Sequence, residues 1–203
     1  MYATWGSFRP GARGIPQCVD EPSLLRTLTK VVTTLDAAGI EFAVAGGCAV
    51  YARGGPPSDH DVDVFVREDE VRAAQAALVE AGMRPVEPPE DWLTKVYDGD
   101  VLVDLVFRPN HRGVDALLER AEVMRIGSTR AKVLDGTDVL VDKLLVLGPH
   151  RCDFAPLLVI ARDLREQVDW ERVAVEVAES AYAKAFLVLL EELSVIEREG
   201  SPV

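Results

Sequence analysis

The chain has 203 residues, a length that suits one domain with a helical appendage. Hydrophobic residues make up 48% and charged residues 28% of the sequence, which is typical of a globular protein and excludes a disordered one. The longest apolar run, residues 154–161, is far shorter than the roughly 20 residues of a membrane-spanning helix, so no membrane association is expected. A net charge of −12 argues against broad affinity for nucleic acid and leaves room only for a local basic site.

The first residues contain no apolar segment typical of a secretory signal. The three cysteines, Cys18, Cys48 and Cys152, have no metal-binding spacing. Because their odd number fits a reducing compartment better than a disulfide framework, we expect a cytoplasmic protein.

In chain order, residues 1–19 contain glycines and prolines without hydrophobic periodicity, which predicts an irregular N-terminal arm. Helices and strands then alternate. The expected elements are a helix over 20–39, a strand over 40–45, a short helix over 48–53, a strand over 61–66 and a helix ending at Gly82.

Two hairpins are expected next, with a helix over 112–121 between them. Their strands lie at 92–97 and 101–107, and around 123–126 and 131–134. Beyond Thr137 the sequence reads as at least three helices. We therefore predict an α/β (α+β) fold, with a small mixed sheet flanked by helices over 20–135 and a C-terminal helical bundle over 136–203.

Asp61 and Asp63 are the most informative residues, because alternate side chains of a strand share one face. Two such carboxylates repel each other unless a cation lies between them. Mg²⁺ binds one or two protein carboxylates and completes its shell with water and phosphate oxygens. The pair thus favours a nucleotide-bound metal, although an edge strand with two solvated aspartates is the alternative.

Asp104 lies in an otherwise apolar segment, where an unpaired carboxylate costs several kcal/mol. It therefore needs an arginine, a lysine or a metal as partner. If its strand lies beside that of Asp61 and Asp63, three carboxylates converge and can hold one or two divalent ions. A structural ion pair is the alternative.

Gly46 and Gly47 end a strand and precede a helix, where glycine lets the backbone approach a phosphate closely. The order of this glycine pair, Asp61-Val62-Asp63 and the later Asp104 resembles the nucleotidyltransferase superfamily related to DNA polymerase β. The similarity covers residues 22–107. Within the superfamily the chain looks most like the MenT- and AbiEii-type toxins, and more distantly like the antibiotic nucleotidyltransferases.

This resemblance implies that Gly46 and Gly47 hold the triphosphate of an NTP. It also implies that Asp61, Asp63 and Asp104 bind Mg²⁺, with Mn²⁺ as an alternative ion, and that Asp104 acts as the base. Relatives carry a Ser/Thr segment just before the first aspartate, and Ser58 is expected to take that phosphate contact here. Asp59, which follows Ser58, adds negative charge where the phosphate would bind. His60 is either a pH-sensitive contact or a surface residue.

Relatives also place a lysine and a later Arg/Asp pair near the triphosphate, and Lys143, Arg151 and Asp153 are the matching residues by resemblance, with Asp163 as the alternative to Asp153. Lys143 lies close to an apolar helical stripe, so its ammonium must extend to solvent or reach a partner. Cations are expected at the rim of the cleft. The candidates are Arg53, Arg108, Arg112, Lys143 and Arg151.

These features predict an enzyme that transfers a nucleoside monophosphate from an NTP to a hydroxyl. The resemblance favours an RNA acceptor, most plausibly a tRNA 3′ end, modified by a toxin whose partner would be a cognate antitoxin. A small-molecule acceptor, an antibiotic or a metabolite, is the first alternative. A non-catalytic nucleotide-binding module is the second.

Overall fold

The computed structural model describes residues 21–58 and 61–197. The predicted N-terminal arm lies outside the described residues, as do Asp59 and His60. The described part is a mixed α/β structure, as predicted, with a seven-stranded sheet flanked by helices.

The sheet has the strand order β3-β4-β5-β2-β1-β7-β6. The pairs β2–β5 and β1–β7 are parallel, and the other neighbours are antiparallel. Both predicted hairpins, β4–β5 and β6–β7, are present. The strands are β1 (Phe42–Val44), β2 (Asp61–Val66), β3 (Arg84–Val86), β4 (Leu93–Asp98), β5 (Val101–Val106), β6 (Glu122–Ile126) and β7 (Thr129–Val133).

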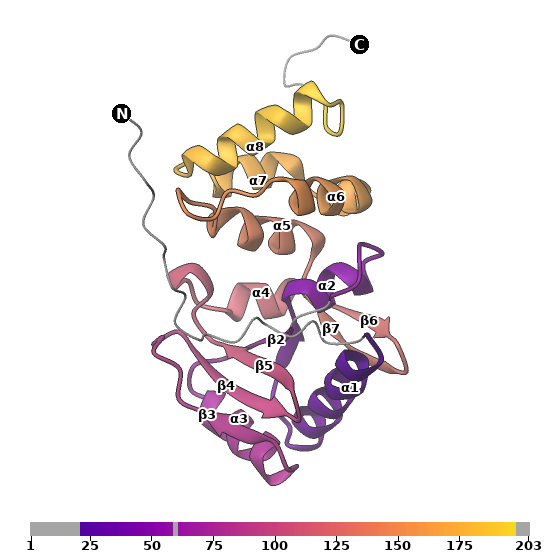
Figure 1. Cartoon of the computed structure of the whole chain (residues 1–203), viewed down its shortest axis with the longest axis vertical. Coiled ribbons are helices and arrows are strands. Elements are labelled where there is room, and N and C mark those ends of the chain that lie inside the picture. The colour runs from indigo at the N-terminus through magenta and orange to yellow at the C-terminus, as the bar shows by residue number, and fades with distance from the viewer. Residues whose placement is uncertain (1–20, 59–60, 198–203) are drawn as a thin grey trace, which may run out of the picture.

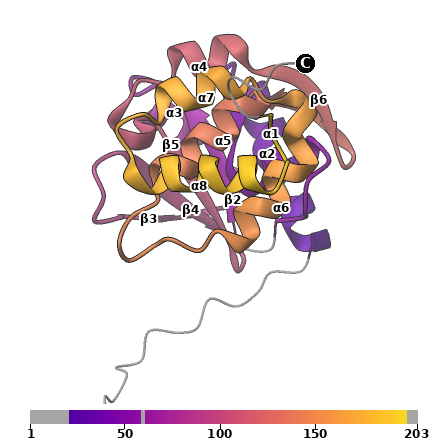
Figure 2. The ribbon, with the colours of Figure 1, turned by 90° about the horizontal axis from the view of Figure 1, so that it is seen from above.

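Helices cover both sides of this sheet (Figure 1). Figure 1 shows α1 and α3 on one side, and α5 to α8 stacked on the other beyond α2 and α4. From above, in Figure 2, the same C-terminal helices lie over the sheet. The helices are α1 (Glu21–Ala37), α2 (Gly46–Ala52), α3 (Val71–Glu80), α4 (Asp115–Arg120), α5 (Gly136–Leu145), α6 (Ala155–Leu164), α7 (Trp170–Glu176) and α8 (Ala181–Glu192), with 3-10 turns η1 (Pro109–His111) and η2 (Arg165–Gln167).

Burial of apolar stripes explains this arrangement. The α1 residues at helical spacing, such as Leu24, Leu28 and Val31, are buried, and α1 contacts β2, β5 and β7. The inner strand β5 is buried at nearly every position, as expected for a strand of a sheet that has helices on both faces. No helix of the described residues is long and apolar enough to cross a membrane.

Several boundaries differ by a few residues from the expected ones, and three differences have a physical reason. The short helix begins at Gly46, not at residue 48, because the glycine pair forms its first turn. The helix expected over 112–121 is limited to Asp115–Arg120. Asn110 and His111 have positive φ angles, so the backbone that leads into this helix is not helical. The edge strand β3 was not predicted, because Pro85 cannot donate to a ladder and hides the strand pattern.

The C-terminal helices are tied to the sheet domain by a buried ionic cluster. Asp138 on α5 is 2% exposed and pairs with Arg120 at the end of α4 and Arg172 on α7. The predicted division of the chain at residue 135 stays a prediction.

Candidate active site

Three carboxylates meet on the sheet face that carries the cleft. The parallel pair β2–β5 places Asp63 directly beside Asp104. One oxygen from each of Asp61, Asp63 and Asp104 lies within 4.8 Å of the others. Their strands therefore bring together the three residues that the sequence singled out, and this set of oxygen donors suits a hard divalent cation.

The local electrostatics favour such a cation. Burial raises the pKa of Asp63 well above its usual range, and the neighbouring Asp61 and Asp104 raise it further, whereas Lys143 lowers it. Asp63 has no hydrogen bond or ion pair from the side chains of the described residues. A bound positive charge would remove this penalty, so the residues present fit a metal ion such as Mg²⁺.

Asp104 has one cationic partner already. Lys95 on β4 lies directly across from it in the antiparallel β4–β5 pair, with its Nζ 3.1 Å from Oδ1 and 2.9 Å from Oδ2. Burial raises the pKa of Asp104, and Lys95 lowers it. The structural ion pair that was the alternative for Asp104 is thus present, and the carboxylate cluster is present as well.

The glycine pair is required by close packing at the start of α2. A Cβ on Gly46 would lie 1.8 Å from Oδ2 of Asp63, and one on Gly47 would lie 2.4 Å from Oγ of Ser58. Gly46 also has a φ of +55°, which favours glycine. Both glycines therefore let the backbone approach the cluster and Ser58 more closely than any other residue would.

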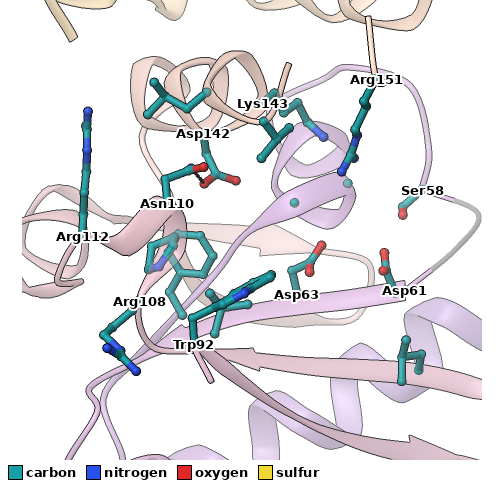
Figure 3. Close-up of a pocket in the computed structure, with 18 of the residues that line it drawn as sticks. Ser58, Asp61, Asp63, Trp92, Arg108, Asn110, Arg112, Asp142, Lys143 and Arg151 are labelled. Carbon is teal, nitrogen blue, oxygen red and sulfur yellow. Dashed lines mark hydrogen bonds between the residues drawn. The ribbon is translucent and has the colours of Figure 1, made fainter. Parts of the chain in front are cut away.

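These groups line a cleft of about 1420 Å³ between the sheet and α5 (Figure 3). The predicted site residues among its lining are Gly46, Gly47, Ser58, Asp61, Asp63, Lys143 and Arg151, whereas Asp104 lies beside Asp63 in the sheet and is not among the lining residues. Two of them, Lys143 and Arg151, extend toward the floor of the cleft that carries Asp61 and Asp63 (Figure 3). Neither side chain makes an ion pair within the described part of the chain, so both cations are available to a phosphate.

Two of the predicted residues, Asp153 and Arg53, are not among the residues that line the cleft. Asp153 is exposed and accepts a hydrogen bond from the Ala155 N–H at 3.0 Å, so it caps the start of α6 and is not part of the described cleft lining. Arg53 is only 7% exposed. It donates to the Leu134 carbonyl and pairs with Glu122, so the expectation that it rims the cleft was wrong.

Arg108 and Arg112 do line the cleft, but carboxylates hold both. Arg112 pairs with Glu176 of α7 at 2.9 Å. Arg108 lies 3.6 Å from the Asp91 carboxylate. Their charge is therefore largely compensated, in contrast to that of Lys143 and Arg151.

Among the lining residues that the sequence interpretation did not single out are Asp142, Asn110 and Trp92. Burial raises the pKa of Asp142 to about 6, while Lys143 and Arg151 lower it. Its Oδ1 accepts a hydrogen bond of 2.7 Å from Nδ2 of Asn110. A carboxylate between Val141 and Lys143 on an apolar helix was a signal available in the sequence. Asn110 and Trp92 carried none, because loop geometry places them.

The comparisons with known proteins concern the sequence segment and the fold that carry this site. A sequence model of the aminoglycoside-2''-adenylyltransferase family matches residues 27–97, about a third of the chain, which includes the glycine pair and both aspartates of β2. A search of curated proteins finds no match for this sequence.

Among solved structures, the solution structure of the antibiotic-resistance factor ANT(2'')-Ia is 16% identical, with a TM-score of 0.63 over 86% of this chain and 99% of that one. The crystal structure of ANT(2'')-Ia in complex with adenylyl-2''-tobramycin gives a TM-score of 0.60 at 16% identity, over 82% of this chain and 98% of that one. The lincosamide antibiotic adenylyltransferase LnuA, bound to lincomycin, gives 0.52 at 12% identity, over 75% and 100%. The chain therefore has the nucleotidyltransferase fold.

Proposed function

We propose that this protein is a nucleotidyltransferase that moves a nucleoside monophosphate from an NTP to a hydroxyl group of a small organic molecule. The observation that carries the proposal is the cluster of Asp61, Asp63 and Asp104, in which one oxygen of each lies within 4.8 Å of the others. Asp61 and Asp63 line a cleft together with Lys143 and Arg151, neither of which forms an ion pair within the described part of the chain. Paired carboxylates facing phosphate-binding cations are what metal-assisted phosphoryl transfer requires.

In this proposal, Lys143 and Arg151 bind the triphosphate from the α5 side, and the glycine pair brings the backbone at the start of α2 close to Asp63 and Ser58. Mg²⁺ held by Asp61 and Asp63 would neutralise phosphate charge. The acceptor oxygen forms a bond to the α-phosphorus, and the bond to pyrophosphate breaks. The hydroxyl proton passes to the carboxylate of Asp104. Positioning and charge neutralisation supply most of the rate enhancement in such chemistry.

The rest of the cleft lining suits a small acceptor. Apolar and aromatic side chains line the cleft together with Asp142 and Asn110, a mixture typical of sites for small molecules. The apolar and aromatic members are Phe65, Trp92, Tyr97, Leu102 and Val106. The described neighbours with this fold are adenylyltransferases of antibiotics, which makes ATP the first donor and an antibiotic the first acceptor to test.

The RNA acceptor expected from the sequence receives less support. The comparisons above concern antibiotic-modifying enzymes. In the structure Arg53 is buried, and Arg108 and Arg112 are held by carboxylates. Of the cations expected at the rim of the cleft, this leaves Lys143 and Arg151 for an RNA backbone, whose binding depends on phosphate neutralisation. An RNA-modifying toxin with an antitoxin partner is therefore the second candidate function.

The experiment incubates the full chain with each of the four NTPs labelled on the α-phosphate, Mg²⁺, and three acceptor sets: tobramycin, lincomycin and total RNA. We expect label in a small molecule, and none with Asp63→Ala. Label confined to RNA would transfer support to the toxin reading. Label in no acceptor, with intact NTP binding, would support a binding module.

A further inference from the structure

Lys95 gives the carboxylate cluster a feature beyond the three predicted aspartates. Its position across from Asp104 puts both side chains on the sheet face that carries Asp61 and Asp63. The ammonium donates to both oxygens of Asp104, at 2.9 and 3.1 Å. In the described part of the chain Asp104 is its only side-chain partner.

This ion pair is sheltered from water. The Lys95 side chain is 20% exposed and the Asp104 side chain 10%. Breaking a partly buried pair leaves a carboxylate without compensation, so the pair resists replacement far more than a surface pair does. Lys95 is therefore a fixed charge of the cluster.

Counting charges shows what this fixed charge implies. When ionised, the three carboxylates carry three negative charges, and Lys95 leaves a balance of two on the side chains of the cluster, which one divalent ion neutralises without counting the nucleotide phosphates. A second divalent ion that took Asp104 as a ligand would lie beside the Lys95 ammonium and share that carboxylate with it. Like charges at such a distance repel strongly where water is scarce.

We propose that Lys95 takes the place of a second metal ion. The site then binds one divalent ion through Asp61 and Asp63, and Lys95 is a positioning residue that holds the Asp104 carboxylate toward the acceptor. This inference rests on the proposed function and specifies its metal requirement.

The test counts bound Mn²⁺ by electron paramagnetic resonance in the presence of α,β-methylene-ATP. We expect one ion per chain for the wild type and two for Lys95→Met. Lys95→Arg, which keeps a cation against Asp104, should bind one. The matched control is Lys30→Met, because Lys30 pairs at 2.6 Å with Asp98 of the same strand, outside the cluster.

Two ions in the wild type, or one ion in a folded Lys95→Met variant, would overturn the inference while leaving the proposed function intact. If neither Mn²⁺ nor the nucleotide binds to the wild type, the proposed function fails together with it. Should Lys95→Met not fold, Lys95→Gln serves instead, since its amide still donates to Asp104 without a charge, and it too should bind two ions.

Discussion

Two groups of buried or partly buried carboxylates in this molecule differ in how their charge is compensated. The side chain of Asp138 is 1% exposed, yet it accepts hydrogen bonds from Nε and Nη2 of Arg120, both at 2.9 Å, and pairs with Arg172. Asp63 has two carboxylates as neighbours and no cation in contact among the described residues.

The difference separates a structural role from a functional one. At Asp138 the chain supplies the cations itself, so the cluster joins α4, α5 and α7 and needs nothing further. At Asp63 the like charges raise the pKa and leave a position that an external cation can fill. Substitutions in the two clusters should therefore have opposite effects on stability and activity.

The largest effect is expected for Asp63→Ala. Loss of a metal-binding carboxylate should reduce nucleotidyl transfer by at least about 1000-fold, because the metal contributes several kcal/mol to the transition state. The free energy of unfolding should stay the same or rise, since like-charge repulsion is removed. Steady-state transfer and chemical denaturation measure both. Wild-type turnover at saturating Mg²⁺ would rule Asp63 out as a ligand.

Asp138→Ala should do the reverse. Removing it leaves Arg120 and Arg172 without their shared partner, and breaking a buried pair typically costs about 3 to 5 kcal/mol of stability. The turnover number of the protein that remains folded should be near that of the wild type. Glu166→Ala, which removes an exposed pair with Arg165, is the control and should change stability by less than about 0.5 kcal/mol. Equal losses in both variants would contradict the structural role.

Asp142→Asn tests a carboxylate of the cleft between these extremes. Its pKa of about 6 lies above the ordinary value of 3.8, so the folded state binds the proton more tightly than the unfolded state does. This contribution is fully present below about pH 4 and is lost as the pH rises through 6. The Asn variant should therefore be more stable than the wild type at pH 7.5, by at most about 3 kcal/mol, and equal to it at pH 4. Chemical denaturation of both proteins at the two pH values measures this difference in the free energy of unfolding. A difference that does not change with pH would refute the raised pKa of Asp142.

Lys143→Ala should produce the smallest of these effects. Loss of one charge-assisted contact to phosphate, worth about 1.5 to 3 kcal/mol, should weaken NTP binding by roughly 10- to 150-fold with little effect on folding. Calorimetric titration with ATP measures the affinity. Lys184→Ala, on α8, is the control, because residue 184 is not among the residues that line the cleft. Unchanged ATP affinity would remove Lys143 from the site.

Strand periodicity and local motifs were sufficient to predict the centre of this site. Alternation in β2 put Asp61 and Asp63 on one face, and the polar exception in an apolar segment identified Asp104. The order of the strands in the sheet was not predictable in the same way, because it depends on contacts between residues far apart in the chain. Consequently Lys95 was overlooked, although it lies only nine residues before its partner.

The outer part of the cleft was predicted less well. Lys143 and Arg151 were assigned to the cleft from resemblance, and the structure places both in it. Residue type alone did not distinguish Arg53 and Asp153 from them. Arg53 donates to a buried carbonyl and Asp153 accepts a backbone N–H before α6, and nothing in the sequence separates these roles from ligand binding. Loop conformation, which the positive φ of Asn110 illustrates, also has no strong signature outside glycine.

Thermal unfolding in the presence and absence of Mg²⁺ tests the central claim, that the cluster of Asp61, Asp63 and Asp104 binds a divalent cation, whereas Asp138 is compensated by the arginines of the chain itself. A ligand that binds only the folded state raises its melting temperature. The wild type and an Arg165→Ala control should show a rise in Tm with increasing Mg²⁺ and ATP analogue, and Asp63→Ala should show none. A wild-type Tm that does not respond to Mg²⁺, or an equal response in Asp63→Ala, would contradict the account.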